Sequence, residues 1–509
     1  MPDKRLIAIT SLFAFLLVSG CITPGDPYHE YRVETLKERI LVPEMHAIQE
    51  KKSEEPFASV FVPDRPISLE EAIAIALKNN HRLRQAFEDM GIAGYDRAIA
   101  RSLFMPHVSA GYAYDRSNRQ PAMVDPANPL MPPMYAGEKE FRRAEIKVMM
   151  TIWDFGLSLG TYNQANLGRD IANLVYRRTH QQVIFQVVNA YFNVLRAQRG
   201  KVIAQESLNQ AKEHLKTAES FERYGVVDRN DVLRARVQVA EVRQMLIKAK
   251  NAMELATSIL NSVLGVNVHL PTRVIDDTRI IPFSISLKDC LQLAIENRPE
   301  FNVVQKAIGI EEEGIRAARA GHLPRIYVAG GYNWNDDDYQ KFADPDGSLH
   351  SDNLYGEIGI QIGLFSGGKT TAEVRKAKKK LTRSGEKAKE VCDGISLQVK
   401  AAFLAIQEAK DRIGVAKEAV AQAEENLRLI NNKYRENVVT STDVVDAETL
   451  LTRNKQNYYT ALYDYIVAIA RLESAVGKKI IGPEKAAGLI SPGLQVEKRN
   501  QRRGNNETG

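Results

Sequence analysis

The sequence lacks proline over two long stretches. None lies between Pro133 and Pro271, and none lies between Pro345 and Pro483. Proline removes a backbone donor and clashes with the preceding helical turn, so its absence leaves both stretches free to form uninterrupted helix. Cysteine is also scarce, and three cysteines in 509 residues exclude a fold that depends on a disulfide framework.

Signatures of chemistry are missing as well. The nine histidines show no metal-binding spacing, and no nucleophile has the local signature of a hydrolase. We therefore expect no enzyme, no metal and no cofactor. The net charge of +6 comes from well-mixed signs, which argues against a nucleic-acid partner. Beyond the N-terminus no run of 18 apolar residues predicts a membrane-spanning helix.

The N-terminus carries an export signal. Residues 1–20 combine two basic residues with a short apolar core, which is typical of a signal peptide. The run Val18-Ser19-Gly20-Cys21 resembles the box at which bacterial lipoproteins are cleaved and lipidated, so we expect a lipid on the Cys21 thiol. The alternative is a lone cysteine after an ordinary signal peptide. By the same resemblance, Ile22 in place of aspartate implies sorting to the outer membrane.

A regular apolar seam organises the rest of the chain. In the second half its members follow each other at alternating steps of three and four residues: Val399, Ala402, Ile406, Ala409, Ile413, Ala416, Val420, Ala423, Leu427 and Ile430. The positions 212 residues earlier repeat the pattern, with Lys201 as the exception. This period is typical of coiled-coil packing, and its repetition indicates an internal duplication. We expect long helices at 157–222, 229–264, 368–434 and 441–476, of which the longest measure roughly 100 Å.

Four other segments alternate apolar and polar residues with a period of two, at 107–116, 143–153, 325–334 and 354–365. Strands of about ten residues with one apolar face are typical of outer-membrane barrels. Four strands cannot close a barrel, and an open edge is not stable in lipid. Three copies would supply twelve strands. The alternative is a small soluble sheet that caps a coiled coil.

These elements divide the mature chain into two structural repeats, 67–270 and 286–480. We expect 21–66 to form a lipidated lead segment and 481–509 a tail that is disordered at its end. The predicted fold is mainly α with a small membrane β part. On the helices alone, a lipid-anchored structural coiled-coil protein of the periplasm, without a pore, is an alternative function.

The duplicated order of short helix, helix, strand, loop, strand, long helix, turn and helix resembles the TolC-like outer-membrane efflux proteins. So do Leu364-Phe365-Ser366-Gly367-Gly368, and Tyr434-Arg435-Glu436-Asn437 before Asp443-Val444-Val445-Asp446-Ala447. With Cys21, the chain looks like the lipoprotein branch of that family.

The resemblance implies a homotrimer with a β-barrel in outer-membrane lipid and an α-barrel in the periplasm. It also implies two protein partners, a periplasmic membrane-fusion (adaptor) protein and an inner-membrane pump of the RND or ABC type. The function implied is a passive exit duct of a tripartite efflux or type I secretion system. The sequence does not indicate the transported substrate.

One motif points elsewhere. The run from Gly363 to Thr370 matches the phosphate-binding pattern G-x-x-x-x-G-K-[ST]. A nucleotide site would need a parallel sheet and an acidic strand end nearby, and neither is predicted. We therefore expect Gly156, Gly367 and Gly368 to bend the chain sharply between strand and helix.

The turns between the long helices lie near 223–230 and 435–442. The resemblance implies that they form a periplasmic tip, where Asp443 and Asp446 of three copies build carboxylate rings that act as gate and cation selector. The alternative is that both aspartates only stabilise the start of a helix.

The family also closes this tip with a latch. The resemblance places Tyr434 at the latch tyrosine and Asp231 at its acidic partner. Val439 occupies the basic position of the latch, which puts the full latch in doubt, and Arg435 is a candidate substitute.

Overall fold

The computed structural model describes residues 65–479, apart from 124–130, 133, 136, 279, 281, 338–340 and 344–348. The chain divides into the units Met1–Pro56 and Phe57–Gly509, and every described residue belongs to the second. The expected signal peptide, Cys21, nearly all of the lead segment and the C-terminal tail therefore lie outside the described residues.

The helices of the two halves match in length. In the first half they are α3 (Leu69–Asn79), α4 (His81–Ser102), α5 (Leu157–Arg223) and α6 (Arg229–Leu264). In the second they are α7 (Leu287–Asn297), α8 (Pro299–Ala320), α9 (Lys369–Arg435) and α10 (Ser441–Val476). Both sets contain 11, 22, 67 and 36 residues in this order. The structure thus confirms the internal duplication.

Local sequence sets the ends of these helices. Ser68 and Glu71 form a reciprocal capping box at the start of α3, which satisfies two backbone donors that have no helical partner. At the other end, α6 and α10 both stop at a glycine in the left-handed region, Gly265 and Gly477. Glycine takes this conformation without a Cβ penalty, so it ends both helices at equivalent points of the repeat.

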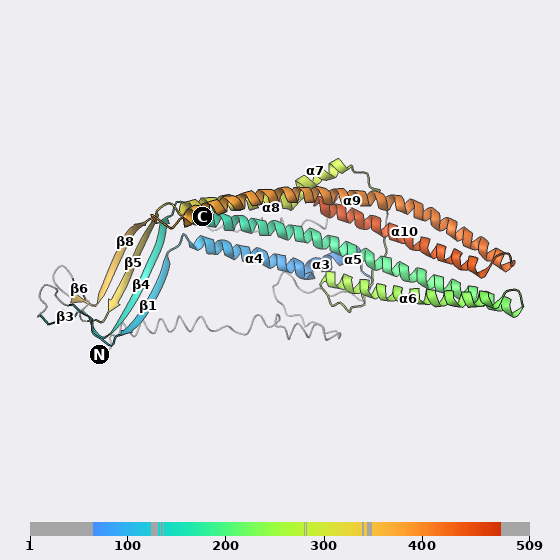
Figure 1. The fold of residues 1–509 in the computed structure, drawn as a ribbon, viewed down its shortest axis with the longest axis horizontal. Helices are drawn as coiled ribbons and strands as arrows, with labels where there is room; N and C mark the ends of the chain where they lie inside the picture. The colour runs from blue at the N-terminus through green and yellow to red at the C-terminus, as the bar shows by residue number, and fades with distance from the viewer. Residues whose placement is uncertain are drawn as a thin grey trace, which may run out of the picture. The chain divides into compact units, whose positions relative to one another are not determined.

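The strands form one antiparallel sheet in the order β1-β4-β5-β8 (Figure 1). They are β1 (His107–Arg116), β4 (Glu140–Trp153), β5 (Arg325–Asn335) and β8 (Asp352–Gln361). Four bounds differ from the sequence prediction, of which the end of β5 at Asn335 and the start of β8 at Asp352 are shifted by one and two residues. β4 begins at Glu140 rather than 143, because Glu140 still pairs with Arg116. β8 ends at Gln361 rather than 365, because Gln361 pairs with Arg325, the first residue of β5.

Short hairpins lie within the segments that were expected to be loops. β2 (Ala122–Met123) pairs with β3 (Met134–Tyr135), and β6 (Phe342–Ala343) pairs with β7 (Leu349–His350). Each follows a long strand of the sheet, so short pairs of strands lie within the connections at this end.

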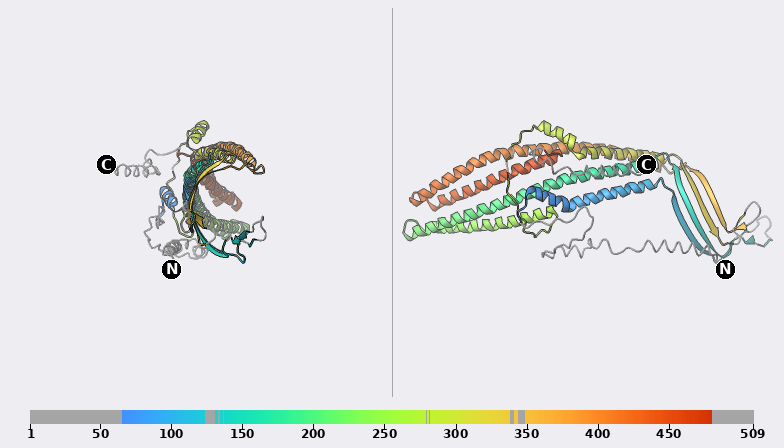
Figure 2. Two further views of the ribbon diagram at one scale, coloured as in Figure 1. Left: turned by 90° about the vertical axis from the view of Figure 1, so that its left-hand side faces the viewer. Right: turned by 180° about the vertical axis from the view of Figure 1, so that it is seen from behind.

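Apolar seams join the long helices in pairs. In the α5–α6 hairpin, Ala204, Leu208 and Ala211 pack with Val242 and Leu246. In the α9–α10 hairpin, Ala423 and Leu427 pack with Ala447 and Leu451. Small alanines let the helix backbones approach closely, as coiled-coil packing requires. Figures 1 and 2 show both pairs running away from the sheet and reversing at the same end of this unit.

Contacts between the halves change in character along the helices. Nearer the sheet, Tyr463 and Val467 of α10 join a large apolar cluster with Val187 and Val194 of α5. Toward the turns the α5–α10 contact becomes polar, with Ser207 hydrogen-bonded to Thr452. None of the described helices has an apolar stretch of the length that a membrane crossing needs.

Candidate functional site

The sheet presents one apolar face that the described part of the chain leaves uncovered. Pairing aligns Ala110, Ile146, Tyr332 and Leu354 in one row across all four strands. Leu354 and Ile358 are each 81% exposed. Exposed apolar surface of this kind marks contact with lipid or with another protein.

The opposite face of the sheet is polar. The Tyr327 hydroxyl donates to Glu357 Oε1 at 2.7 Å, and the Tyr355 hydroxyl donates to Glu145 Oε1 at 3.4 Å. Since side chains alternate between the faces of a strand, these charged and hydroxyl groups line the side away from the apolar rows. A sheet that is apolar on one side and polar on the other matches the wall of a membrane barrel.

Within the described chain, β1 and β8 each pair with one neighbour only. Each therefore presents a row of backbone donors and acceptors along its other edge. Open edges of this length pair readily with another strand, and none is stable in a hydrocarbon environment.

The strand-to-helix junctions bend at residues in the left-handed region. Gly156 has φ 102°, Gly367 has φ 62° and Gly368 has φ 81°. In the first half, the Asp154 carboxylate accepts a hydrogen bond from the Ser158 backbone at 2.8 Å, which helps to start α5. In both halves the turn leads directly from a sheet strand into a 67-residue helix.

The run from Gly363 to Thr370, which matches the phosphate-binding pattern, has surroundings that differ from those of a nucleotide site. Each described long strand next to it is antiparallel, and Lys369 lies at the exposed start of α9, 4.0 Å from the Glu373 carboxylate. Ser366 Oγ and Thr370 Oγ1 lie 3.1 Å apart on this open surface. The run from 363 to 368 is exposed throughout, so it forms no cradle for a phosphate group.

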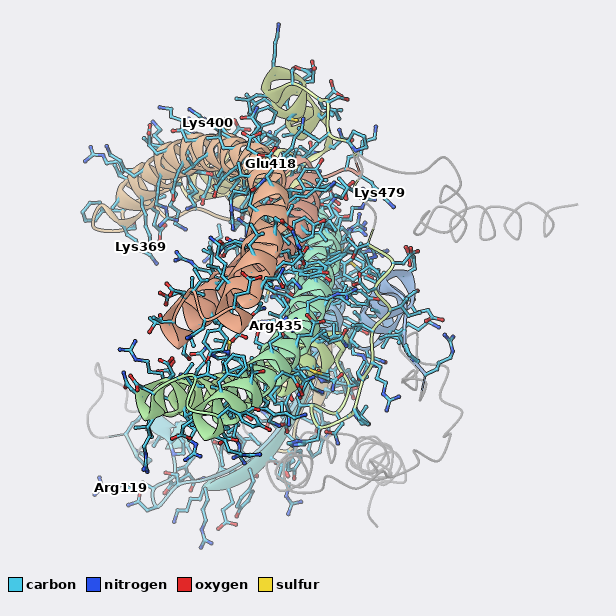
Figure 3. The ribbon with its side chains drawn as sticks, turned by 90° about the vertical axis from the view of Figure 1, so that its right-hand side faces the viewer. Arg119, Lys369, Lys400, Glu418, Arg435 and Lys479 are labelled. Carbon is cyan, nitrogen blue, oxygen red and sulfur yellow. The ribbon has the colours of Figure 1, made fainter. Side chains whose placement is uncertain are left out.

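The turns between the long helices repeat one hydrogen-bond motif. After α5, Gly225 N donates to Glu222 O at 2.9 Å and Val226 N to Phe221 O at 2.8 Å. After α9, the equivalent donors are the backbone nitrogens of Asn437 and Val438, at 3.0 and 2.9 Å. Gly225 and Asn437 both have positive φ, as this helix-ending motif requires. Figure 3 looks onto this end, with Arg435 labelled at the end of α9.

Tyr434, the expected latch tyrosine, is buried between the two hairpins. Tyr434 is 2% exposed, and its ring packs on Phe221 and His214 at centroid distances of 5.7 and 5.0 Å. Its hydroxyl has no hydrogen-bond partner within the described residues, so it does not donate to Asp231. Burial and the charge of Asp231 raise the pKa of Tyr434 to about 12. Tyr434 therefore acts here as a packed aromatic ring.

Other residues link the two hairpins at this end. His214 Nε2 lies 2.8 Å from Ser441 Oγ, and the Arg234 guanidinium donates to Thr442 Oγ1. Burial lowers the pKa of His214, although the Asp231 carboxylate opposes that effect. No pattern in the sequence had predicted these contacts. A signal was available, because His214 follows Ala211 by three residues and precedes Ala218 by four, so it lies next to the apolar seam of α5.

The two aspartates of the tip differ in their surroundings. Asp443 accepts hydrogen bonds from Thr440 N and Thr440 Oγ1, both at 2.8 Å, and these bonds lower its pKa. It thus completes a capping box at the start of α10. Asp446 lies one helical turn further along α10, and its side chain is exposed, whereas Ala447 beside it is buried. Within the described residues, no group of three or more His, Cys, Asp or Glu side chains is placed to hold a metal ion.

Known proteins share this arrangement. The family profile described as "Outer membrane efflux protein" matches residues 72–266 and 290–478, one match in each half. The outer membrane protein TolC of Vibrio cholerae is 24% identical over 407 residues, which cover 79% of this chain and 87% of TolC. TolC of Escherichia coli is 24% identical over 414 residues, 78% of this chain and 80% of TolC.

The fold matches a solved channel structure. The CmeC outer membrane channel of Campylobacter jejuni superimposes with a TM-score of 0.70 at 18% identity, covering 82% of this chain and 88% of CmeC. A likeness over this share of both chains extends to the fold as a whole. The two profile matches and the duplicated fold agree, and the chain belongs to the outer membrane efflux protein family.

Proposed function

We propose that three copies of this chain form the exit duct of a tripartite efflux or type I secretion system in the outer membrane. The observation that carries the proposal is the four-stranded sheet, whose apolar face and two edges are left uncovered by the described residues. Because the four strands alternate in direction, β8 of one copy can pair antiparallel with β1 of the next. Three such pairings would close a barrel of twelve strands.

The helices would continue this passage into the periplasm. Each chain contributes two hairpins, α5–α6 and α9–α10, whose apolar seams are satisfied within the hairpin. Three chains would place six hairpins around one axis. A duct of this kind moves no substrate by itself, so an inner-membrane pump of the RND or ABC type and a periplasmic adaptor would supply the cargo and the energy.

The anchor and the gate belong to the same proposal. A lipid on Cys21 would fix the N-terminus in the outer membrane; a mature N-terminus other than modified Cys21, measured by mass spectrometry, would contradict this. At the tip, Asp443 and Asp446 would form carboxylate rings that favour cations, alongside the helix-capping role of Asp443.

The mass of the detergent-solubilised protein tests the assembly. We expect a stable trimer that dissociates only on heating or in denaturant, because each copy would bury two strand edges against its neighbours. A protein that remains monomeric in mild detergent, with its sheet intact by circular dichroism, would contradict the proposed barrel.

A further inference from the structure

A buried polar row separates the two hairpins near their turns. It comprises Ser207 and His214 on α5, and Ser441, Glu448 and Thr452 on α10, all 8% exposed or less. Ser207 Oγ lies 2.7 Å from Thr452 Oγ1, and His214 Nε2 lies 2.8 Å from Ser441 Oγ. Two hydrogen bonds thus hold the row together, one toward each end.

Glu448 lies between these two contacts. It is 6% exposed, and its Oε2 atom is buried without a hydrogen bond to any described residue. A cavity of about 110 Å³ adjoins it, lined also by Ser207, Gln238, Met245 and Thr452. A space of this size holds a few water molecules at most. The ligand that suits a lone buried carboxylate there is a proton.

No charged neighbour among the described residues offsets an ionised Glu448. Charged or titratable side chains occur at several positions on the surrounding stretches 206–214, 234–243, 424–428 and 446–455: Glu206, Lys212, Glu213 and His214 on α5, Arg234, Arg236, Glu241 and Arg243 on α6, Glu424, Glu425 and Arg428 on α9, and Asp446, Arg453 and Lys455 on α10. Lys455 lies instead 3.2 Å from Glu424 and 3.9 Å from Glu206. Arg453 borders the cavity without an ion pair to the buried Oε2 atom. Burial alone raises the pKa of Glu448 to about 7.

We propose that Glu448 is a proton-binding site that keeps the two hairpins together when protonated and loosens their contact when ionised. A neutral carboxyl group fits a buried contact with few water molecules, whereas a carboxylate needs more water or a donor. The apolar contact of Tyr463 and Val467 with α5 nearer the sheet would stay intact, so only the turn end would separate.

The direction with pH follows from the raised pKa. The protonated contact is fully stable below the ordinary carboxyl value of 4.5, and its stability is lost as the pH rises through about 7. His214 gains its proton only below about pH 6.5, because burial lowers its pKa from 6.5. The interval from about pH 6.5 to 8 therefore isolates the effect of Glu448.

Hydrogen–deuterium exchange of the assembled full-length protein tests the site. Wild type is compared with Glu448→Gln, which keeps the shape but cannot ionise, and with Glu418→Gln, an exposed control on α9. After correction for intrinsic exchange rates, residues 441–456 of wild type and of the control should lose about fourfold in protection between about pH 6.5 and 8. Glu448→Gln should show no such loss.

Equal protection of wild type and Glu448→Gln at about pH 8 would overturn the proposal. If Glu448→Gln does not assemble, Glu448→Met has similar length and no charge, and the same result is expected of it. Only the consequence of this site rests on the proposed function: the entrance to the duct would be wider above about pH 7. Exchange needs no pore, so a lack of ion conductance would contradict the proposed function and not this site.

Discussion

His214 Nε2 lies 2.8 Å from Ser441 Oγ, and this contact joins residues 227 positions apart in the two halves of the chain. Ser441 is fully buried at the first residue of α10. The contact therefore joins the start of α10 to the last turns of α5. It lies beside the Tyr434 ring, where the family resemblance had placed a tyrosine–aspartate latch.

We expect acid to weaken this contact through His214. Burial lowers the pKa of His214 from 6.5, so stability is complete above that ordinary value and is lost as the pH falls through the lowered one. Exchange protection of residues 441–447 should decrease between about pH 6.5 and 5 in a Glu448→Gln background, in which residue 448 does not titrate. His214→Gln keeps a hydrogen-bonding group that does not titrate, and it should reduce this decrease. An unchanged acid response in His214→Gln would assign the effect to another group.

The Tyr434 hydroxyl should matter little and its ring should matter much. The hydroxyl has no partner among the described residues, so Tyr434→Phe should change the stability of the tip by less than about 1 kcal/mol. Tyr434→Ala removes the ring that packs on His214 and Phe221 and should cost about 3–5 kcal/mol. Hydrogen–deuterium exchange of the tip at increasing urea concentrations compares the local stability of the two variants. A large effect of Tyr434→Phe would show that the hydroxyl is bonded in the assembled protein.

The carboxylates at the tip should set ion preference. In a trimer, Asp443 and Asp446 would repeat around one axis and attract cations. Replacing both by asparagine removes the charge and retains capping ability. Cation preference and block by divalent ions should both weaken in single-channel recordings. Asp443→Asn alone separates the contribution of the capping-box residue Asp443 from that of Asp446. If the double variant keeps wild-type selectivity, both aspartates only stabilise the start of α10.

Two glycines in the same conformation should respond differently to alanine. Gly225 has φ 73° and open space where a Cβ would lie, whereas a Cβ on Gly265 would collide with the Asn79 carbonyl group. Gly225→Ala should therefore cost only the left-handed strain of about 1–2 kcal/mol. Gly265→Ala should destabilise the protein further, because α3 must move. Thermal unfolding monitored by circular dichroism ranks the variants, and equal midpoints would contradict the close approach.

A charge on the apolar face of the sheet should impair membrane insertion. Ile358 belongs to that face and is 81% exposed. Ile358→Lys should therefore cost about 2–4 kcal/mol near the middle of a bilayer. Gln361→Lys lies on the polar face of the same strand and is the matched control. Refolding into lipid vesicles measures both. Equal insertion of the two variants would mean that the apolar face is not in contact with lipid.

Regular features of the fold could be predicted because each leaves a periodic signal. The seam from Val399 to Ile430 predicted the long helices to within one residue at most ends, and alternation located all four long strands. Strand ends were less certain, because pairing with a partner decides them: Glu140 extends β4 by pairing with Arg116. A sequence pattern does not show which residues become partners.

The contacts between the halves were hidden for a similar reason. His214 and Glu448 are polar residues beside the apolar seams, and only tertiary packing shows that both become buried at the α5–α10 contact. The Tyr434 hydroxyl was assigned a partner by resemblance, yet it is buried here without one among the described residues. Short-range rules set the helix ends well, while bonds between residues in different halves of the chain needed the structure.

Planar-bilayer recording of the purified, detergent-solubilised protein tests the central claim most directly. If three copies form an outer-membrane duct, addition of the protein to one side should produce discrete current steps of uniform size, with a preference for cations. The double variant of Asp443 and Asp446 should keep the steps and lose part of that preference. A trimer that inserts into the bilayer and passes no current under any voltage or pH would contradict the account.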